Sequence, residues 1–288
     1  MPKILMLSAF FCLFALPLRA EDTAAAEEAA GSLRANFKRV AVEFSSTNVS
    51  NAEEYQNSPV SALSADSETV MKGLLDFVLE YNQPNYQWNN SVYLEYGKTT
   101  LKPHDKPKSS SENADEILIT SDYNRKMWRY QNADVGPFAS LAYQTEFTAN
   151  DDAPRNKTLR AKAGIKLFNG KYVKSLYAAA VGEFDMTYSP EDTKSAYEVG
   201  LTFEYPVREG VKFHVNGYFR DYLTYSRYVG TDFKYDLNID SRMDVKISDH
   251  LSLAPVVNYR RAMAREASSA GSNLMIGVSL GYSGSFDL

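Results

Sequence analysis

The amino-acid sequence predicts an all-β fold: a closed antiparallel up-and-down transmembrane β-barrel of twelve strands, with ten as the alternative strand count. The chain has 288 residues, 44% of them apolar and 13% aromatic, including 20 Tyr and 15 Phe. This composition favours a strand-rich folded domain over a disordered chain. Two further observations predict the barrel: long segments in which apolar and polar residues alternate, and connections that are short and longer in turn.

The first residues are typical of a cleaved secretory signal peptide, residues 1–20. Lys3 precedes an apolar run from Ile4 to Leu16, and a small residue, Ala20, stands before an acidic pair. A membrane-anchoring helix is the alternative, but the run is short for a bilayer span. Residues 21–36 are rich in Ala and Glu and are expected to form a periplasmic leader before a barrel domain at residues 37–288.

Cysteine and charge exclude several kinds of chemistry. The only cysteine, Cys12, lies in the signal peptide, so the mature chain has neither disulfides nor thiolate sites. Without Lys3 and Arg19 the mature chain has 29 basic and 36 acidic residues, a net charge of −7. This balance argues against nucleic acid as a partner, and nothing in the sequence calls for a cofactor.

A two-residue alternation runs from Val40 to the C-terminus, and it is clearest from Phe233 to Ile247, where odd positions are almost all apolar and even positions are charged or polar. The other segments of this kind are Met71–Tyr81, Tyr86–Tyr96, Ile117–Met127, Val135–Phe147, Leu159–Leu167, Leu176–Tyr188, Tyr197–Tyr205, Val211–Phe219, Leu251–Met263 and Leu274–Leu288. Strands of a soluble sandwich have about five or six residues, whereas transmembrane strands need about 9 to 11. The length of these segments favours a barrel over the alternative, a secreted soluble β-sandwich pair.

The connections alternate in length, as expected for short periplasmic turns and longer external loops. The short ones are Asn82–Asn85, Trp128–Asp134, Asn169–Lys171, Pro206–Gly210 and Ser248–His250. The longer ones are Ser45–Asp66, Gly97–Ala114, Thr148–Thr158, Ser189–Ala196, Arg220–Asp232 and Ala264–Ser272. For the turn after Tyr81 to be periplasmic, an earlier strand is needed, and Phe37–Phe44 is the candidate. It completes twelve strands and puts both termini in the periplasm.

Aromatic residues gather where strands meet the short turns. At a lipid–water boundary such amphipathic rings form a belt, whereas packing within a soluble sheet would scatter them along the strands. The predicted aromatic belt is Tyr81, Tyr86, Trp88, Trp128, Tyr172, Phe203 and Tyr205.

The chain ends as a strand, with one parity from Leu274 to Leu288. This end resembles the C-terminal strand that the barrel-insertion machinery recognises in bacterial outer-membrane β-barrels, although here Leu288 is last and the aromatic Phe286 stands two residues earlier. Residues 70–288, with segments such as FVLEYNQPNYQWNNSVYLEYG and FASLAYQTEF, resemble those barrels and, more loosely, the salt-induced outer-membrane protein family. The resemblance implies a porin-like barrel in the bacterial outer membrane, in contact with outer-membrane lipid, and little about activity.

The polar positions of the alternating segments are expected to face inward, and they predict a lumen lined by charges of both signs. These residues are Arg160, Lys162, Lys166, Lys212, His214, Arg220, Asp232, Lys234, Asp236, Asp240, Arg242, Asp244, Lys246 and Arg260. One hypothesis is a narrow channel for ions or small polar solutes. The alternative is that these charges pair across strands and close the lumen, giving a non-conducting structural or envelope-stress barrel.

An enzyme is not expected. Some twelve-stranded outer-membrane barrels are phospholipases, and His250 and Ser252 have a matching residue pair, but they lie at a short turn with Ser252 facing inward rather than at the lipid-facing rim. His104 and His214 each stand apart from other histidines, so neither predicts a metal site. No catalytic or metal-binding residue is therefore assigned.

Overall fold

The computed structural model describes residues 31–55, 63, 67–101, 109–147 and 155–288. The chain divides into two units, residues 1–30 and residues 31–288, and the described part belongs to the second. The predicted signal peptide and the first part of the predicted leader lie outside the described residues.

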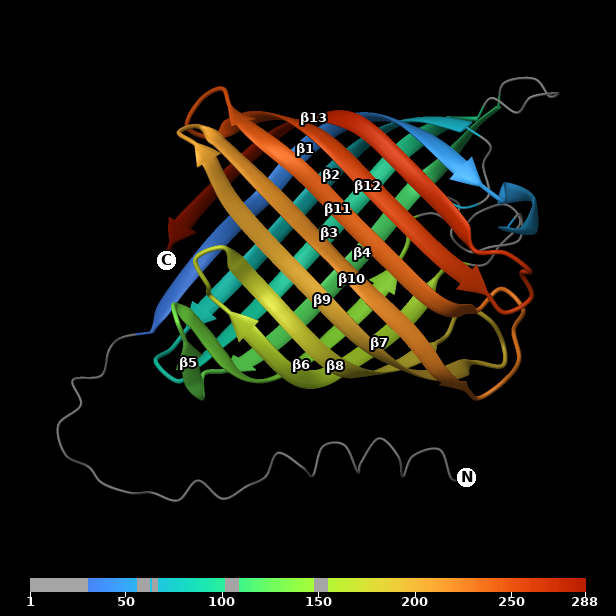
Figure 1. The fold of residues 1–288 in the computed structure, drawn as a ribbon, viewed down its shortest axis with the longest axis horizontal. Helices are drawn as coiled ribbons and strands as arrows, with labels where there is room; N and C mark the ends of the chain where they lie inside the picture. Colours follow the sequence, from blue (N-terminus) through green and yellow to red (C-terminus); the bar gives the residue numbers. More distant parts are fainter. Residues whose placement is uncertain (1–30, 56–62, 64–66, 102–108, 148–154) are drawn as a thin grey trace, which may run out of the picture. The chain divides into compact units, whose positions relative to one another are not determined.

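The described part is built almost entirely of β-strands that run obliquely around a closed barrel (Figure 1). The elements are β1 (Ser32–Ser50), the 3₁₀ helix η2 (Ala52–Tyr55), β2 (Ser67–Asn82), β3 (Tyr86–Leu101), β4 (Ser109–Arg125), β5 (Trp128–Tyr130), β6 (Ala133–Thr145), β7 (Lys157–Phe168), β8 (Val173–Asp185), β9 (Asp192–Arg208), β10 (Val211–Tyr225), β11 (Phe233–Lys246), β12 (Leu251–Ala264) and β13 (Gly271–Asp287).

Except for β4 and β5, strands that are consecutive in sequence pair antiparallel, and β1 pairs with β13. A pairing between β4 and β6 closes the sheet. The short β5 continues the line of β4: β4 pairs with β6 up to Asn124↔Phe138, and β5 takes over at Trp128↔Val135. Counting β4 and β5 as one staggered strand gives the predicted closed barrel of twelve antiparallel strands, which is confirmed. The alternative of two stacked sheets is wrong.

The barrel begins earlier than predicted. β1 starts at Ser32 rather than Phe37, and the last residues of the predicted leader pair on both sides, for example Leu33 with Tyr81 and Asn36 with Ser285. A β-bulge between Phe37 and Val40 shifts the register and breaks the side-chain parity there. The alternation that marks a strand is therefore interrupted where the strand begins.

Most strands are longer than their apolar alternation. β1 continues to Ser50, β3 continues to Leu101, and β10 continues to Tyr225, so the start predicted for the long connection Arg220–Asp232 is wrong and the connection begins at residue 226. Backbone pairing needs no apolar side chain, and a ladder can extend beyond the lipid-facing band. The predicted alternation of connections holds: those between β2 and β3, β5 and β6, β7 and β8, β9 and β10, and β11 and β12 have at most four residues, and the others have six or more.

These connections define the two ends of the barrel, called here the short-turn end and the long-loop end. Both chain ends of the barrel lie at the short-turn end, since Ser32 pairs with Asn82 and the amide of Leu288 donates to the Leu33 carbonyl at 2.9 Å. In Figure 1 this end is on the left, where the C-terminus is marked.

The outer face is apolar and the inner face is polar. On β1, Val42 and Phe44 are 47% and 57% exposed, whereas the intervening Glu43 and Ser45 are buried. On β13 the outward residues Ile276, Val278 and Leu280 are likewise exposed. Such continuous apolar exposure marks a surface that is covered by something other than water, here lipid. Among the described residues, no helix is long and apolar enough to cross a membrane.

A small apolar core lies at the long-loop end. Tyr55 of η2 and Leu63 pack with Ala262 and Ala264 of β12. The Tyr55 hydroxyl lies 3.0 Å from the carbonyl oxygen of Ala262 and 2.8 Å from that of Ser269. The first long connection is therefore fixed to the wall where β12 turns towards β13.

Candidate functional site

The lumen contains a cavity of about 1640 Å³, called here the vestibule. It reaches the short turns, since Glu209, Gly210 and His250 are among its lining residues. Strands from all around the barrel contribute to its wall, and ten basic and eleven acidic residues line it. Charges of both signs therefore surround a cavity at the short-turn end that is large enough for many water molecules.

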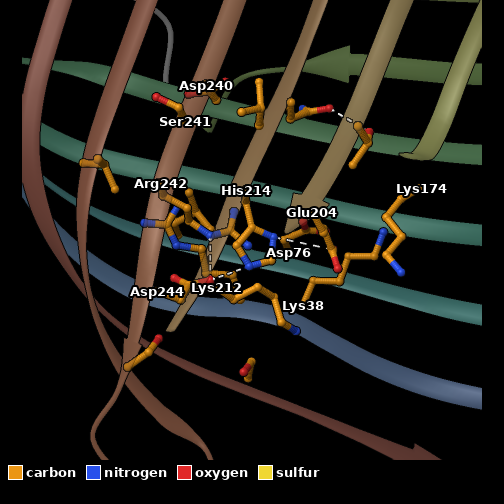
Figure 2. Close-up of a pocket in the computed structure, with 18 of the residues that line it drawn as sticks. Lys38, Asp76, Lys174, Glu204, Lys212, His214, Asp240, Ser241, Arg242 and Asp244 are labelled. Carbon is orange, nitrogen blue, oxygen red and sulfur yellow. Dashed lines mark hydrogen bonds and ion pairs between the residues drawn. The ribbon is translucent and has the colours of Figure 1, made fainter. Parts of the chain in front are cut away.

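The vestibule entrance carries cations from three parts of the wall: Lys38 of β1, Lys174 of β8 and Lys212 of β10 (Figure 2). No other described residue forms an ion pair with these three ammonium groups. Alternation on β10 and β11 turns Lys212 and its cross-strand neighbour Asp244 towards the lumen. The entrance is consequently rich in lysines that are free to meet a solute.

Two entrance carboxylates already have partners. His214 Nε2 lies 2.8 Å from Asp244 Oδ2, and His214 Nδ1 lies 3.5 Å from Glu204 Oε1. Arg242 Nε donates to the same Asp244 oxygen at 3.2 Å. Figure 2 shows these side chains grouped on the inner face of neighbouring strands. Histidine and arginine thus engage two of the carboxylates, whereas Asp76 and Glu209, which also line the vestibule, form no ion pair with a described residue.

Deeper in the vestibule the balance changes towards negative charge. Lys72 of β2 lies 3.4 Å from Glu43 and 3.3 Å from Glu95, measured from its Nζ to a carboxylate oxygen. The Tyr93 hydroxyl donates to Glu95 at 2.5 Å. One lysine thus serves two carboxylates.

Two further carboxylates complete this deeper region, which we call the vestibule floor (Glu43, Lys72, Glu95, Glu116 and Asp240). Glu116 accepts a hydrogen bond from the Gln144 amide at 2.9 Å, and Asp240 accepts one from the Asn258 amide at 2.7 Å. Neither forms an ion pair with another described residue. The floor therefore carries four carboxylates and one ammonium group.

Beyond the vestibule, β7 to β10 carry a packed group of charges called here the ionic cluster: Arg160, Lys162, Glu183, Glu198 and Arg220. Arg220 Nη2 and Lys162 Nζ each lie 2.5 Å from a Glu198 oxygen, and Arg160 Nη2 lies 2.5 Å from Glu183. Glu198 is 1% exposed and Arg220 is 4% exposed. None of the five lines the vestibule, so the ionic cluster lies outside this cavity.

Two other buried groups neighbour the ionic cluster. Arg260 of β12 donates two hydrogen bonds to Asp236, at 3.1 and 2.9 Å, and the Tyr218 hydroxyl donates to the same carboxylate at 2.8 Å. Towards the long-loop end, Lys194 Nζ lies 2.6 Å from Asp232 and 3.0 Å from Asp185. Each buried charge in these groups has a partner of opposite sign.

The predicted lumen residues fall into five places. The vestibule is lined by Lys166, Lys212, His214, Asp240, Arg242, Asp244, Lys246 and Arg260. Arg160, Lys162 and Arg220 belong to the ionic cluster, Asp236 pairs with Arg260, and Asp232 pairs with Lys194 near the long-loop end. Lys234 is exposed and lies at a register shift between β11 and β12.

Sequence reasoning missed the contribution of β1 to β4. Lys38, Glu43, Lys72, Glu95 and Glu116 all line the vestibule. On β2 the inward positions alternate between charged and aliphatic residues, since Leu74 and Val78 are buried between Lys72, Asp76 and Glu80. The inward face therefore has no unbroken polar parity. On β2, charged residues occur only at every fourth position, so a search for alternating polar residues does not detect the inward face of this strand.

The predicted belt residues lie next to the short turns. Tyr81 and Tyr86 have ring centroids 6.1 Å apart across the first turn, and the ring centroids of Tyr172, just before β8, and Tyr205 of β9 are 5.4 Å apart. Trp88 and Trp128 are exposed, and Phe203 stacks on Tyr205.

The residues considered for catalysis and metal binding do not come together. His250 Nδ1 lies 3.2 Å from the Ser283 carbonyl and its ring contacts Tyr282, while Ser252 lines the vestibule. His104 lies outside the described residues. Within the described ranges, no group of three or more His, Cys, Asp or Glu residues has the arrangement of a metal site.

Comparison with known proteins relates the chain to outer-membrane barrels. Residues 62–150 match a family described as "Protein of unknown function (DUF3078)". No curated protein matches the chain. The COG4313 outer membrane channel from Pseudomonas putida F1 is 12% identical, covers 92% of this chain and 100% of its own, and superimposes with a TM-score of 0.53.

Two other solved structures are similar at lower scores. The outer membrane channel DcaP of Acinetobacter baumannii is 8% identical, with a TM-score of 0.40 and coverage of 91% of this chain and 100% of its own. Outer membrane phospholipase A from Escherichia coli is 10% identical, with a TM-score of 0.40 and coverage of 84% and 89%. With its apolar outer face and the fold it shares with the Pseudomonas channel, this chain has the architecture of a transmembrane β-barrel.

Proposed function

We propose that the barrel is a narrow channel for ions or small polar solutes. The observation that carries the proposal is the vestibule, a charged cavity of about 1640 Å³ inside a barrel whose outer face is apolar. A lumen that served stability alone would be filled by side chains throughout. Short turns face the periplasm in outer-membrane barrels, so the vestibule opens there in this proposal.

The ionic cluster is the proposed constriction. Its cations lie on β7 and β10 and its carboxylates lie on β8 and β9 between them, and each charge pairs with at least one charge of opposite sign. Ions or small solutes would pass this constriction by exchanging contacts with water for contacts with the charged side chains, as in other charged constrictions. Large solutes would be excluded because buried ion pairs have fixed geometry.

A non-conducting structural barrel is the second candidate, and the burial of Glu198 and Arg220 favours it. In that case the ionic cluster closes the lumen permanently and the vestibule is a blind pocket. A lipid hydrolase is not proposed, since His250 contacts the backbone and a ring of β13 rather than Ser252.

Planar-bilayer recording of the purified full chain separates the channel from the closed barrel. We expect discrete current steps in the wild type and larger steps in the double variant Glu198→Ala/Arg220→Ala, which removes a charge pair and the volume of both side chains. Arg34→Ala is the matched control, because Arg34 pairs with Asp287 on the exposed surface. Silence in both the wild type and the double variant would support the closed barrel instead.

The two ends of the chain are the proposed signals for export and for insertion into the membrane. We propose that a signal peptide at residues 1–20 directs export and that the barrel-insertion machinery recognises β13. Phe286 is exposed near the end of β13 and its ring lies 6.3 Å from that of Phe37 on β1, so an aromatic group is available at the seam between the two chain ends.

A further inference from the structure

We propose that the vestibule binds small dipolar solutes that carry both a carboxylate and an ammonium group, with short peptides as the class that fits best. This inference rests on the proposed channel function and names its solute. It is carried by charged groups at two depths of the vestibule that form no ion pair with a described residue: three lysines at the entrance, and Glu116 and Asp240 at the floor.

The entrance fits the carboxylate of such a solute. Lys38, Lys174 and Lys212 come from strands on different sides of the opening, and they have no ion-pair partner in the described part of the chain (Figure 2). Lysine ammonium groups on flexible stems can turn towards an anion from several directions. A carboxylate in this region therefore gains charge-assisted hydrogen bonds without breaking an existing ion pair.

The floor fits the ammonium group. Glu116 and Asp240 accept hydrogen bonds from neutral amides alone, and neither forms an ion pair with another described residue. A ligand ammonium group supplies three donors, which suits a site lined by four carboxylates. Lys72 already serves Glu43 and Glu95.

The spacing of the two regions sets the size of the solute. Asp240 at the floor and Asp244 at the entrance are on β11, and Lys212 is the cross-strand neighbour of Asp244. Four residues of strand span about 13 Å at about 3.3 Å per residue. An extended chain of three residues covers roughly 10 Å, and the lysine stems bridge the remainder. A tripeptide therefore reaches both regions at once, whereas a single amino acid reaches one.

Solutes with a single charge fit less well. An anion attracted to the entrance lysines meets the floor carboxylates as it advances, and a cation attracted to the floor must first pass the lysines. Asp244 and Glu204, which both contact His214, also interrupt the basic surface. The described lining therefore has no continuous positive stripe for an acidic polymer. Only a solute with both signs is favoured along the whole vestibule.

The test compares trialanine with two analogues of nearly equal size: N-acetyl-trialanine, which lacks the ammonium group, and trialanine amide, which lacks the carboxylate. Binding to the full chain in detergent is measured by calorimetry, and block of the current is measured in the bilayer. We expect trialanine to bind at least about tenfold more tightly than either analogue, the gain expected from one charged contact. Equal affinity for all three peptides, or no binding of any, would overturn the inference.

Variants locate the site. Glu116→Gln/Asp240→Asn should remove the preference over the acetylated peptide, and Lys38→Gln/Lys174→Gln/Lys212→Gln should remove the preference over the amide. Arg155→Gln is the control, since Arg155 contacts the Phe147 carbonyl at the long-loop end. Binding without current steps would reject the channel and keep the site. Current steps without discrimination would reject the site and keep the channel.

Discussion

Arg220 shows how single residues hold the inner wall together. Its guanidinium group lies 2.5 Å from a Glu198 oxygen and 3.7 Å from a Glu183 oxygen. Its Cζ atom lies over the Tyr218 ring, 5.1 Å from the ring centroid. Removing three charges from water is costly, and only well-placed hydrogen bonds offset that cost. The ionic cluster meets this condition because Lys162 and Arg160 also contact the same two carboxylates.

Replacing Arg220 should therefore destabilise the barrel strongly. Arg220→Met leaves Glu198 and Glu183 buried with one cation each, and we expect a loss of about 3–5 kcal/mol in the free energy of unfolding. Urea unfolding in lipid vesicles measures it. The exposed pair Arg34–Asp287 provides the control, since Arg34→Met should change stability by no more than about 0.5 kcal/mol. Equal effects of the two variants would show that the ionic cluster contributes no stability.

The stability of the folded loop at the long-loop end should depend on pH through Glu54. Its carboxylate accepts hydrogen bonds from the Ser268 hydroxyl at 2.9 Å and from the amides of Ser268 and Ser269 at 2.6 and 3.1 Å. The Ser268 hydroxyl and then the backbone amides lower the pKa of Glu54 below its ordinary value. The hydrogen bonds therefore stabilise the folded loop above the unfolded pKa, and this contribution is lost as the pH falls through the lower folded pKa.

Amide hydrogen exchange of Ser268 and Ser269 measures this effect. We expect protection near neutral pH that declines only once the pH falls below the ordinary glutamate pKa, about 4.3. Glu54→Gln should remove this pH dependence. Protection that is lost already above that value would contradict the assignment.

The strand is the unit that separates lipid from lumen. On β9, Leu201 points outward and Thr202, its neighbour, lines the vestibule. Leu201→Arg places a charge near the middle of the lipid-facing band and should destabilise the barrel by about 2–4 kcal/mol. Thr202→Arg, one residue away, should have a much smaller effect because its side chain enters water. Vesicle-based unfolding of both variants checks this, and a reversed order would mean that the inner and outer faces are exchanged.

The strands were predicted correctly where apolar and polar residues alternate without interruption. The segment Phe233–Ile247 matches β11 to within one residue. The prediction failed at interruptions: the bulge in β1 concealed residues 32–36, and the break between β4 and β5 appears only in the structure. At that break a Cβ on Gly136 would lie 1.8 Å from the Arg125 carbonyl oxygen, so the close approach of the two strands depends on glycine. Local sequence does not reveal which glycine has this role.

At the scale of the whole barrel, closure creates the site. Sequence parity identifies inward residues on each strand, but the floor combines Lys72 of β2, Glu116 of β4 and Asp240 of β11, which only the closed sheet brings to one cavity. Parity also cannot say which inward charges fill the lumen and which line open space. That difference depends on the packing of Arg220 and Glu198 against their neighbours, a property of the assembled wall.

The near balance of ten basic and eleven acidic lining residues predicts weak ion selectivity for the proposed channel. The reversal potential in a potassium chloride gradient should lie near zero, because cations and anions each meet regions of favourable and unfavourable sign. Lys38→Glu/Lys174→Glu/Lys212→Glu should make the current selective for potassium, and more so at low salt, where screening is weaker. The matched control is Lys171→Glu, at a short turn outside the vestibule lining. Strong selectivity in the wild type, or an equal shift in the control, would show that the permeating ions do not pass through the vestibule.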